Sequence, residues 1–205
     1  MSFIIYTPEE NIPDEISLIA QLLDEGADFL YVRKPTLDDF SLVDYIESIS
    51  EKYYPKIITT SLIITKEFDL AGYHFTRDIL RKNTRYNEKV RAWLHEKNKI
   101  CSVSAHDIDE IKSYSALYNH VIVSPIFPSI SKENHAYNWN KNELIHTLVE
   151  CNSNATLFAV GGIDEHTIAE AKRMGFLNFG LLGAIWKNTE LAVDSFKKVK
   201  KIALL

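Results

Sequence analysis

A segment in the second half of the chain places hydroxyl and ammonium groups directly after a short apolar run. This segment begins at Ser124 and contains Ser129, Ser131 and Lys132. Serine hydroxyls donate hydrogen bonds to phosphate oxygens, and a lysine ammonium supplies a positive point charge. Taken alone, the segment is more typical of a Ser/Pro-rich surface turn. The phosphate-binding interpretation therefore depends on what lies beside it.

Two glycine-containing segments farther along the chain carry groups of the same chemistry. Gly161 and Gly162 follow one apolar run, and Leu182 and Gly183 end the next. Paired glycines let a ligand approach backbone N–H groups, although they are also common in tight turns. The segment from Leu182 can begin a short helix whose N–H groups point at an anion. The three segments together predict a phosphate-binding site more strongly than any one of them.

The first half of the chain adds other polar side chains that follow apolar runs. Arg33 can make a bidentate contact with phosphate or pyrophosphate, and a structural salt bridge is the alternative at this position. Ser104 can form a hydrogen bond to a ligand ring. His74 can act as an acid, a base or a ligand, and a purely structural role fits it at least as well. No nucleophile elbow, Walker loop or HExxH helix is present.

Short apolar runs and amphipathic segments alternate along the whole chain, and they set where these groups lie. The apolar runs predict strands at residues 3–6, 29–32, 56–59, 73–75, 100–103, 121–123, 157–160 and 179–182. The segments between them carry apolar residues at helical spacing. This alternation implies parallel strands joined by crossover helices. We therefore predict an α/β protein with a single (β/α)₈ TIM barrel domain over residues 1–205, with a doubly wound open sheet as the alternative. In a barrel, the loops after the strands meet at one end, where ligands bind.

Composition excludes several classes of function. Apolar residues make up 46% of the chain and charged residues 25%, which is ordinary for a soluble globular protein. The net charge is -5 and the basic residues form no block, so a nucleic-acid-binding surface is not expected. Cys101 and Cys151 are isolated, which predicts neither a disulfide framework nor a zinc site. Neither a signal peptide nor a long apolar run is present, so we expect a cytoplasmic protein without membrane contact. Nothing in the sequence points to a particular oligomeric state.

Read in order, these segments resemble the thiamine phosphate synthase family, and the resemblance covers nearly the whole chain. The matching motifs are Tyr31-Val32-Arg33-Lys34-Pro35, Gly72-Tyr73-His74, Ser102-Val103-Ser104-Ala105-His106, Pro125 to Lys132, Val160-Gly161-Gly162-Ile163 and Gly180 to Ile185. The stretch from Pro125 to Lys132, followed at the family's distance by the double glycine, is the most specific of them.

The resemblance implies an enzyme of thiamine biosynthesis. The family joins hydroxymethylpyrimidine diphosphate to thiazole phosphate with Mg²⁺ and releases pyrophosphate. By resemblance, the thiazole phosphate is held by Ser129, Ser131, Gly162, Leu182 and Gly183, and Gly161 is a further substrate-binding position. Arg33 and Lys132 hold the departing pyrophosphate as the catalytic pair, and Ser104 lies against the pyrimidine. Cations placed around a leaving group stabilise the negative charge that builds on it.

The chain departs from the family pattern where the diphosphate and metal bind. Tyr31 stands where the family has Gln, and Lys34 is the lysine nearest to the family's second cation position. Thr59 and Thr60 replace an Asn-Asp pair whose Asp is a Mg²⁺ ligand, and neutral hydroxyls are poor substitutes for a carboxylate at Mg²⁺. By this alignment Tyr31, Lys34 and Thr59 are substrate-binding positions, and Asp78 is the candidate metal ligand.

Two other functions stay open. Thiazole tautomerases share the barrel and the thiazole phosphate site, but they use a His in the loop where this chain has Pro125. A tautomerase-like isomerase needs no Mg²⁺ and would have to use His74 or His106 as its acid–base group. A non-catalytic binder or sensor of a thiamine-related phosphate is the third hypothesis. In each case we expect the partners to be phosphorylated small molecules.

Overall fold

A closed barrel of parallel strands forms the centre of the computed structural model, which describes residues 1–82, 84–128, 139–151 and 154–205. Each strand pairs with the next one along the chain, and β8 pairs with β1 to close the ring. The strands are β1 (Phe3–Tyr6), β2 (Phe29–Val32), β3 (Ile57–Thr59), β4 (Gly72–Phe75), β5 (Ile100–Ala105), β6 (His120–Val123), β7 (Thr156–Val160) and β8 (Asn178–Leu181). The (β/α)₈ prediction is confirmed, and the β1–β8 pairing excludes the open sheet.

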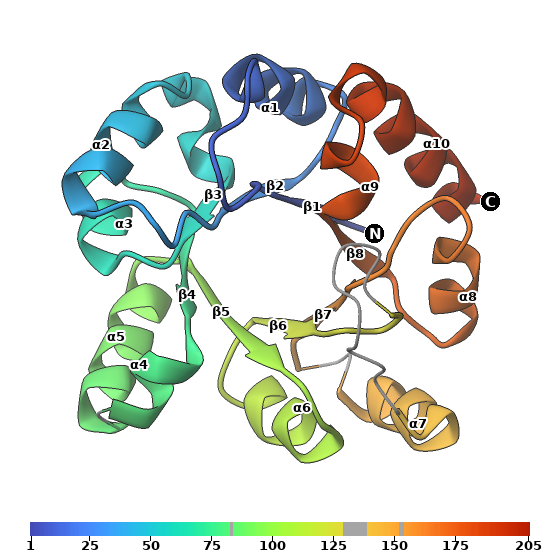
Figure 1. The fold of residues 1–205 in the computed structure, drawn as a ribbon. Helices are drawn as coiled ribbons and strands as arrows, with labels where there is room; N and C mark the ends of the chain where they lie inside the picture. The colour runs from blue at the N-terminus through green and yellow to red at the C-terminus, as the bar shows by residue number, and fades with distance from the viewer. Residues whose placement is uncertain (83, 129–138, 152–153) are drawn as a thin grey trace.

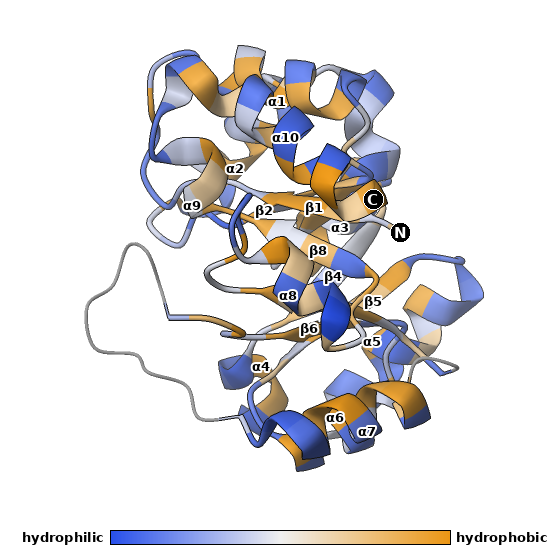
Figure 2. Ribbon diagram, turned by 90° about the vertical axis from the view of Figure 1, so that its right-hand side faces the viewer, coloured by the Kyte–Doolittle hydropathy of each residue, from blue (hydrophilic) through white to orange (hydrophobic). Residues whose placement is uncertain are grey.

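Helices surround the barrel as an outer ring, and the apolar strands lie inside it (Figures 1 and 2). They are α1 (Glu15–Asp24), α2 (Asp39–Glu47), α3 (Leu62–Glu67), α4 (Arg77–Lys82), α5 (Thr84–Glu96), α6 (Ile108–Ser115), α7 (Lys141–Cys151), α8 (Ile168–Arg173), α9 (Gly183–Trp186) and α10 (Ala192–Leu204), with 3₁₀ turns η1 (Glu51–Lys56) and η2 (Thr189–Leu191). Local caps explain several of the helix starts. Asp107 accepts a hydrogen bond from the Glu110 N–H at 2.7 Å and begins α6. Within the described residues, no helix is long and apolar enough to cross a membrane.

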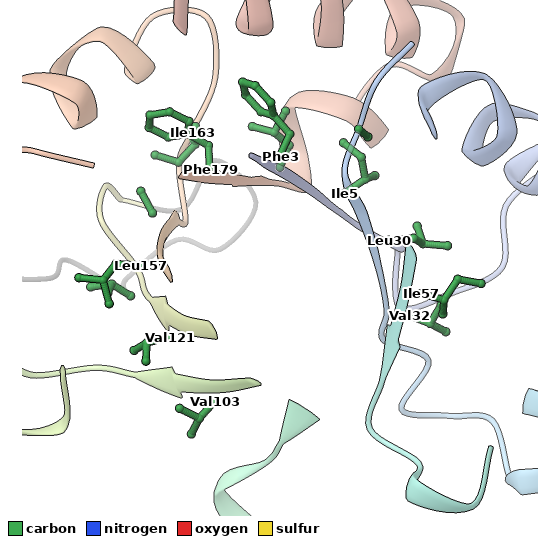
Figure 3. Close-up of a cluster of buried hydrophobic side chains, with 14 of the residues drawn as sticks. Phe3, Ile5, Leu30, Val32, Ile57, Val103, Val121, Leu157, Ile163 and Phe179 are labelled. Carbon is green, nitrogen blue, oxygen red and sulfur yellow. The ribbon is translucent and has the colours of Figure 1, made fainter. Parts of the chain in front are cut away.

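The strand side chains divide into an outer and an inner set, because successive residues of a strand point to opposite faces. The outer set packs against the helices, and Figure 3 shows Leu30, Val32 and Ile57 pointing from β2 and β3 toward that ring. The inner set fills the barrel with a small cluster of its own: Ile4, Tyr6, Tyr31, Ile58, Ile122 and Phe158. This division decides which residues at the strand ends face a ligand.

His120 begins β6 and lies in the barrel interior among aromatic rings. Its ring centroid lies 5.2 Å from that of Phe29 and 5.0 Å from that of Phe158. Its Nδ1 atom is buried without a hydrogen-bond partner in the described part of the chain. Burial away from water disfavours the charged imidazolium, so the pKa of His120 is lowered to about 4.

The low pKa of His120 predicts acid-sensitive stability. In the unfolded chain His120 takes up a proton below about pH 6.5, whereas the folded state resists protonation until about pH 4. The free energy of unfolding therefore decreases as the pH is lowered from about 6.5 to about 4. At about pH 5 the loss from this residue is about 2 kcal/mol. We expect His120→Phe to lose about that much less than the wild type between about pH 8 and pH 5, measured by urea unfolding. Equal losses in the two proteins would contradict this assignment.

Candidate functional site

A cavity of about 500 Å³ opens at the end of the barrel where the strands terminate. We call it the mouth cavity. Its lining residues are Tyr6, Thr7, Tyr31, Arg33, Thr60, His74, Phe75, Thr76, Arg77, Ser104, His106, Ile122, Ser124, Val160 and Leu182. They come from the ends of different strands, which is where (β/α)₈ barrels place their ligands. A volume of this size suits a small molecule.

Strand β2 delivers Tyr31 and Arg33 to the mouth cavity on the same side of the chain. The pairing with β1 continues past the end of the strand, since the Arg33 N–H donates to the Thr7 hydroxyl at 2.9 Å. Tyr31 stacks on Tyr6 with the ring centroids 4.6 Å apart. Two residues beyond Tyr31, Arg33 shares its side and also lines the cavity. The structure therefore places both predicted residues in one site.

Lys34 points the opposite way and does not line the mouth cavity, so its contact with a substrate stays a prediction. Its ammonium is fully buried beneath the β1–α1 loop, 2.9 Å from a carboxylate oxygen of Glu15 and 3.0 Å from the backbone oxygen of Glu10. The Tyr45 hydroxyl donates to the other Glu15 oxygen at 2.6 Å. Strand alternation gives the physical reason, because neighbours of an inward-facing residue face outward. Lys34 is part of a buried ion pair that connects the β1–α1 loop, α1 and α2.

Thr59 is a second predicted substrate-binding residue that does not line the mouth cavity, for the same reason. It pairs with the outward-facing Val32 in the β2–β3 register and is fully buried. Its hydroxyl oxygen accepts a hydrogen bond from the Ser61 N–H at 3.3 Å. The neighbouring Thr60 lines the mouth cavity instead.

The predicted magnesium ligand Asp78 does not line the mouth cavity. It is exposed in the first turn of α4. No carboxylate is among the described residues that line the cavity, and the same part of the chain contains no cluster of three or more His, Cys, Asp or Glu side chains. Mg²⁺ binds in proteins through carboxylate oxygens together with water and phosphate oxygens. The described walls of the cavity therefore do not fit a carboxylate-held Mg²⁺.

Two guanidinium groups give the mouth cavity its positive charge. Arg33 forms an ion pair with Glu9, and both side chains are about half exposed. Arg77 lies 3.2 and 3.3 Å from the two carboxylate oxygens of Glu110. Exposed ion pairs of this kind contribute little to stability, so both guanidiniums can exchange a carboxylate for an anionic ligand.

A chain of hydrogen bonds forms the polar wall of the mouth cavity. His74 Nδ1 lies 3.0 Å from the Ser102 hydroxyl, and His74 Nε2 lies 3.3 Å from the Ser104 hydroxyl. The His74 ring meets the edge of Tyr31 at 4.8 Å. The pKa of His74 is lowered to about 3, mainly by burial and to a smaller extent by the electrostatic influence of Arg33 and His106. His74 is therefore neutral at physiological pH and holds the predicted ligand contact Ser104 in place.

The double glycine is required by the packing of two neighbouring loops. Gly161 and Gly162 have φ angles of 93° and 64°, which residues other than glycine rarely adopt. A Cβ atom on Gly161 would lie 2.7 Å from the Cα of Pro125, and one on Gly162 would lie 2.7 Å from the Cβ of Phe127. Backbone hydrogen bonds from Ile126 to Val160 and from Phe127 to Gly161 join the same loops. A direct contact between these glycines and a phosphate stays a prediction.

The remaining predicted phosphate contacts are divided. Leu182 lines the mouth cavity, whereas Gly183 lines a separate hollow of about 550 Å³ that also includes Asp164 and Lys187. Ser129, Ser131 and Lys132 lie outside the described residues. Sequence reasoning missed Tyr6, although it ends β1 at the same end of the barrel as the residues that were found. It also missed Arg77 and Thr76, since α4 has no apolar stripe to mark its start.

Comparison with known proteins identifies a family and structures with the same fold. The family model described as thiamine monophosphate synthase matches residues 3–185. A crystal structure of thiamine phosphate pyrophosphorylase from Bacteroides thetaiotaomicron is similar, with 26% sequence identity, a TM-score of 0.78, and coverage of 100% of this chain and 98% of that one.

Two more distant structures share the fold. Thiamine phosphate pyrophosphorylase from Pyrococcus furiosus matches with 13% identity and a TM-score of 0.80 over 99% of this chain and 95% of that one. The 3-hexulose-6-phosphate synthase from Salmonella typhimurium matches with 14% identity and a TM-score of 0.71 over 100% of this chain and 99% of that one. At these identities the likeness concerns the fold alone.

Proposed function

The chain belongs to the thiamine monophosphate synthase family, and from this premise we propose that it is a thiamine phosphate synthase-like transferase. Its substrates are hydroxymethylpyrimidine diphosphate and thiazole phosphate, and its products are thiamine phosphate and pyrophosphate. The observation that carries the proposal is the convergence of Arg33, Ser104 and Leu182 in one cavity at the mouth of the barrel. These are residues that the family resemblance assigns to the pyrophosphate, the pyrimidine and the thiazole phosphate.

The described residues supply groups suited to each part of this reaction. Tyr31 presents an aromatic ring in the cavity that Ser104 also lines, and the Ser104 hydroxyl can form a hydrogen bond to a heteroaromatic ring. As the bond from the pyrimidine methylene carbon to the diphosphate oxygen breaks, its electron pair leaves with pyrophosphate, and the thiazole nitrogen then bonds to that carbon. Arg33 stabilises the charge that builds on the departing oxygens, and its planar guanidinium suits two of them at once.

A second candidate function is favoured by the absence of carboxylates from the described walls of the mouth cavity. A tautomerase-like isomerisation of thiazole phosphate needs a proton-transfer group and no divalent cation. Two histidines, His74 and His106, line the cavity. His74 suits this role poorly, because its pKa of about 3 keeps it unprotonated near neutral pH and hydroxyls occupy both of its nitrogens.

A turnover assay with purified protein separates these functions. We expect thiamine phosphate and pyrophosphate to appear in equal amounts when both substrates are present. Since no step proposed here depends on a carboxylate-held metal, we expect measurable turnover to persist in excess EDTA, and Mg²⁺ to act at most through the diphosphate. Conversion of the thiazole phosphate alone would favour the isomerase. Binding of the thiazole phosphate without turnover of any substrate would contradict both enzymes and favour a sensor.

A further inference from the structure

His106 follows β5 and has a ring orientation that its contacts determine. Its Nδ1 atom lies 2.7 Å from the backbone carbonyl oxygen of Ser124. A carbonyl oxygen can only accept a hydrogen bond, so Nδ1 must carry the hydrogen. The second ring nitrogen, Nε2, has no hydrogen-bond partner among the described residues, and His106 lines the mouth cavity. The nitrogen that can gain and lose a proton is therefore the one left for a ligand.

The backbone around His106 holds the ring from a second direction. The His106 N–H donates to a Glu110 carboxylate oxygen at 2.7 Å, and Asp107 begins α6 directly after it. A histidine whose Nδ1 donates to a fixed acceptor keeps its orientation in both protonation states. The arrangement contrasts with that of His74, whose two nitrogens are both occupied by serine hydroxyls.

The charged groups around His106 come from several elements. Glu110 and Asp107 belong to its own side of the barrel, and Arg77 approaches from α4 and pairs with Glu110. His74 from β4 also lines the cavity and is influenced electrostatically by His106. Since the described lining residues include no carboxylate, an anionic ligand in the mouth cavity would be balanced by guanidinium groups and by a protonated His106.

We propose that His106 is the proton donor to the departing diphosphate, through Nε2. This inference rests on the proposed transferase function. As the methylene carbon–oxygen bond breaks, its electron pair goes to the diphosphate oxygen, and the Nε2 proton of the imidazolium passes to that leaving group. His106 is then neutral and regains a proton from water. The proton supplies charge compensation at a place where the described residues provide no metal ligands.

Calorimetric titration with sodium pyrophosphate in excess EDTA tests the contact without turnover. We expect the wild type to bind pyrophosphate more tightly at about pH 6 than at about pH 8, and this ratio of affinities to be about tenfold larger than in His106→Gln. The ionisation of pyrophosphate and of the surrounding groups is common to both proteins, so the difference between their ratios reports on His106.

Two further variants separate protonation from structure. His106→Asn keeps an amide that can donate to Ser124 but lacks any group at the Nε2 position, and we expect its ratio of affinities to be as small as that of His106→Gln. His146→Gln removes an exposed histidine of α7 that pairs with Glu150, and we expect it to keep the wild-type ratio. Thermal unfolding of each variant checks that the barrel is intact.

The outcomes are distinct for this inference and for the proposed function. Equal pH dependence in the wild type and folded His106→Gln, or no pyrophosphate binding by the wild type, overturns the assignment of His106. A protein that makes no thiamine phosphate, yet shows the difference in pyrophosphate binding, contradicts the transferase while supporting His106 as the protonated contact. In the active enzyme, we expect kcat to fall with rising pH in the wild type and to be low and nearly independent of pH in His106→Gln.

Discussion

We expect Lys34→Met to lower the free energy of unfolding by about 3–5 kcal/mol, because it removes one partner of a buried ion pair. Lys34 and Glu15 are both buried, with 2.9 Å between the ammonium nitrogen and the carboxylate oxygen. Methionine fills similar space but leaves the Glu15 carboxylate without its counter-ion. An uncompensated buried charge is costly because water no longer solvates it. Urea unfolding monitored by circular dichroism measures the change.

A matched pair of variants distinguishes burial from charge. Lys52→Met removes a lysine that pairs with Asp24 across 3.4 Å, but both of those side chains are more than half exposed. We expect that variant to unfold almost as the wild type does, since water already solvates its partner. The double variant Lys34→Met/Glu15→Leu removes both buried charges, and we expect it to recover part of the loss. A small effect of Lys34→Met alone would contradict the buried ion pair.

Lys34 also shows which features of the structure could be predicted from the sequence and which could not. Alternating apolar runs were enough to predict a closed barrel, because each strand is a recognisable apolar segment. They also located the mouth of the barrel, which lies where those segments end. The direction of a side chain needs more than this, since a shift of one residue reverses every inward and outward position of a strand. Arg33 and Lys34 are neighbours in the sequence, yet one faces the cavity and the other a buried carboxylate.

Thr59 and Thr60 illustrate the same limit of strand parity. Strand β3 has only three residues, so its alternation is too short to set an inner and an outer face from the sequence. The register supplies the answer, because Tyr31 pairs with Ile58 inside the barrel and Val32 pairs with Thr59 outside it. The position of Asp78 outside the mouth cavity has a different cause. The alignment that selected it ran past the end of β4 into α4, a helix with no buried residue.

Arg33→Ala is expected to lower kcat/KM for the coupling reaction by about 100-fold, which corresponds to about 2.7 kcal/mol of transition-state stabilisation. Arg33 lies in the mouth cavity on the same side of β2 as Tyr31. Charge-assisted hydrogen bonds from a guanidinium to phosphate oxygens each contribute about 1.5–3 kcal/mol, and the alanine variant loses both prongs of the fork. Steady-state kinetics with varied pyrimidine diphosphate measure the loss, and Arg81→Ala, which removes an exposed arginine of α4, is the control.

The ion pair between Arg33 and Glu9 leads to a related prediction in which a substitution strengthens anion binding. In the absence of ligand the guanidinium contacts the Glu9 carboxylate, so binding of an anion must displace that carboxylate. We therefore expect Glu9→Gln to bind pyrophosphate a few-fold more tightly than the wild type, since an amide competes less well than a carboxylate for Arg33. Arg33→Lys keeps the charge but not the planar fork, and its kcat/KM should lie between those of the wild type and Arg33→Ala. If Arg33→Ala and Arg33→Lys both bind pyrophosphate like the wild type, the anion lies elsewhere in the mouth cavity and Arg77 becomes the guanidinium to replace next.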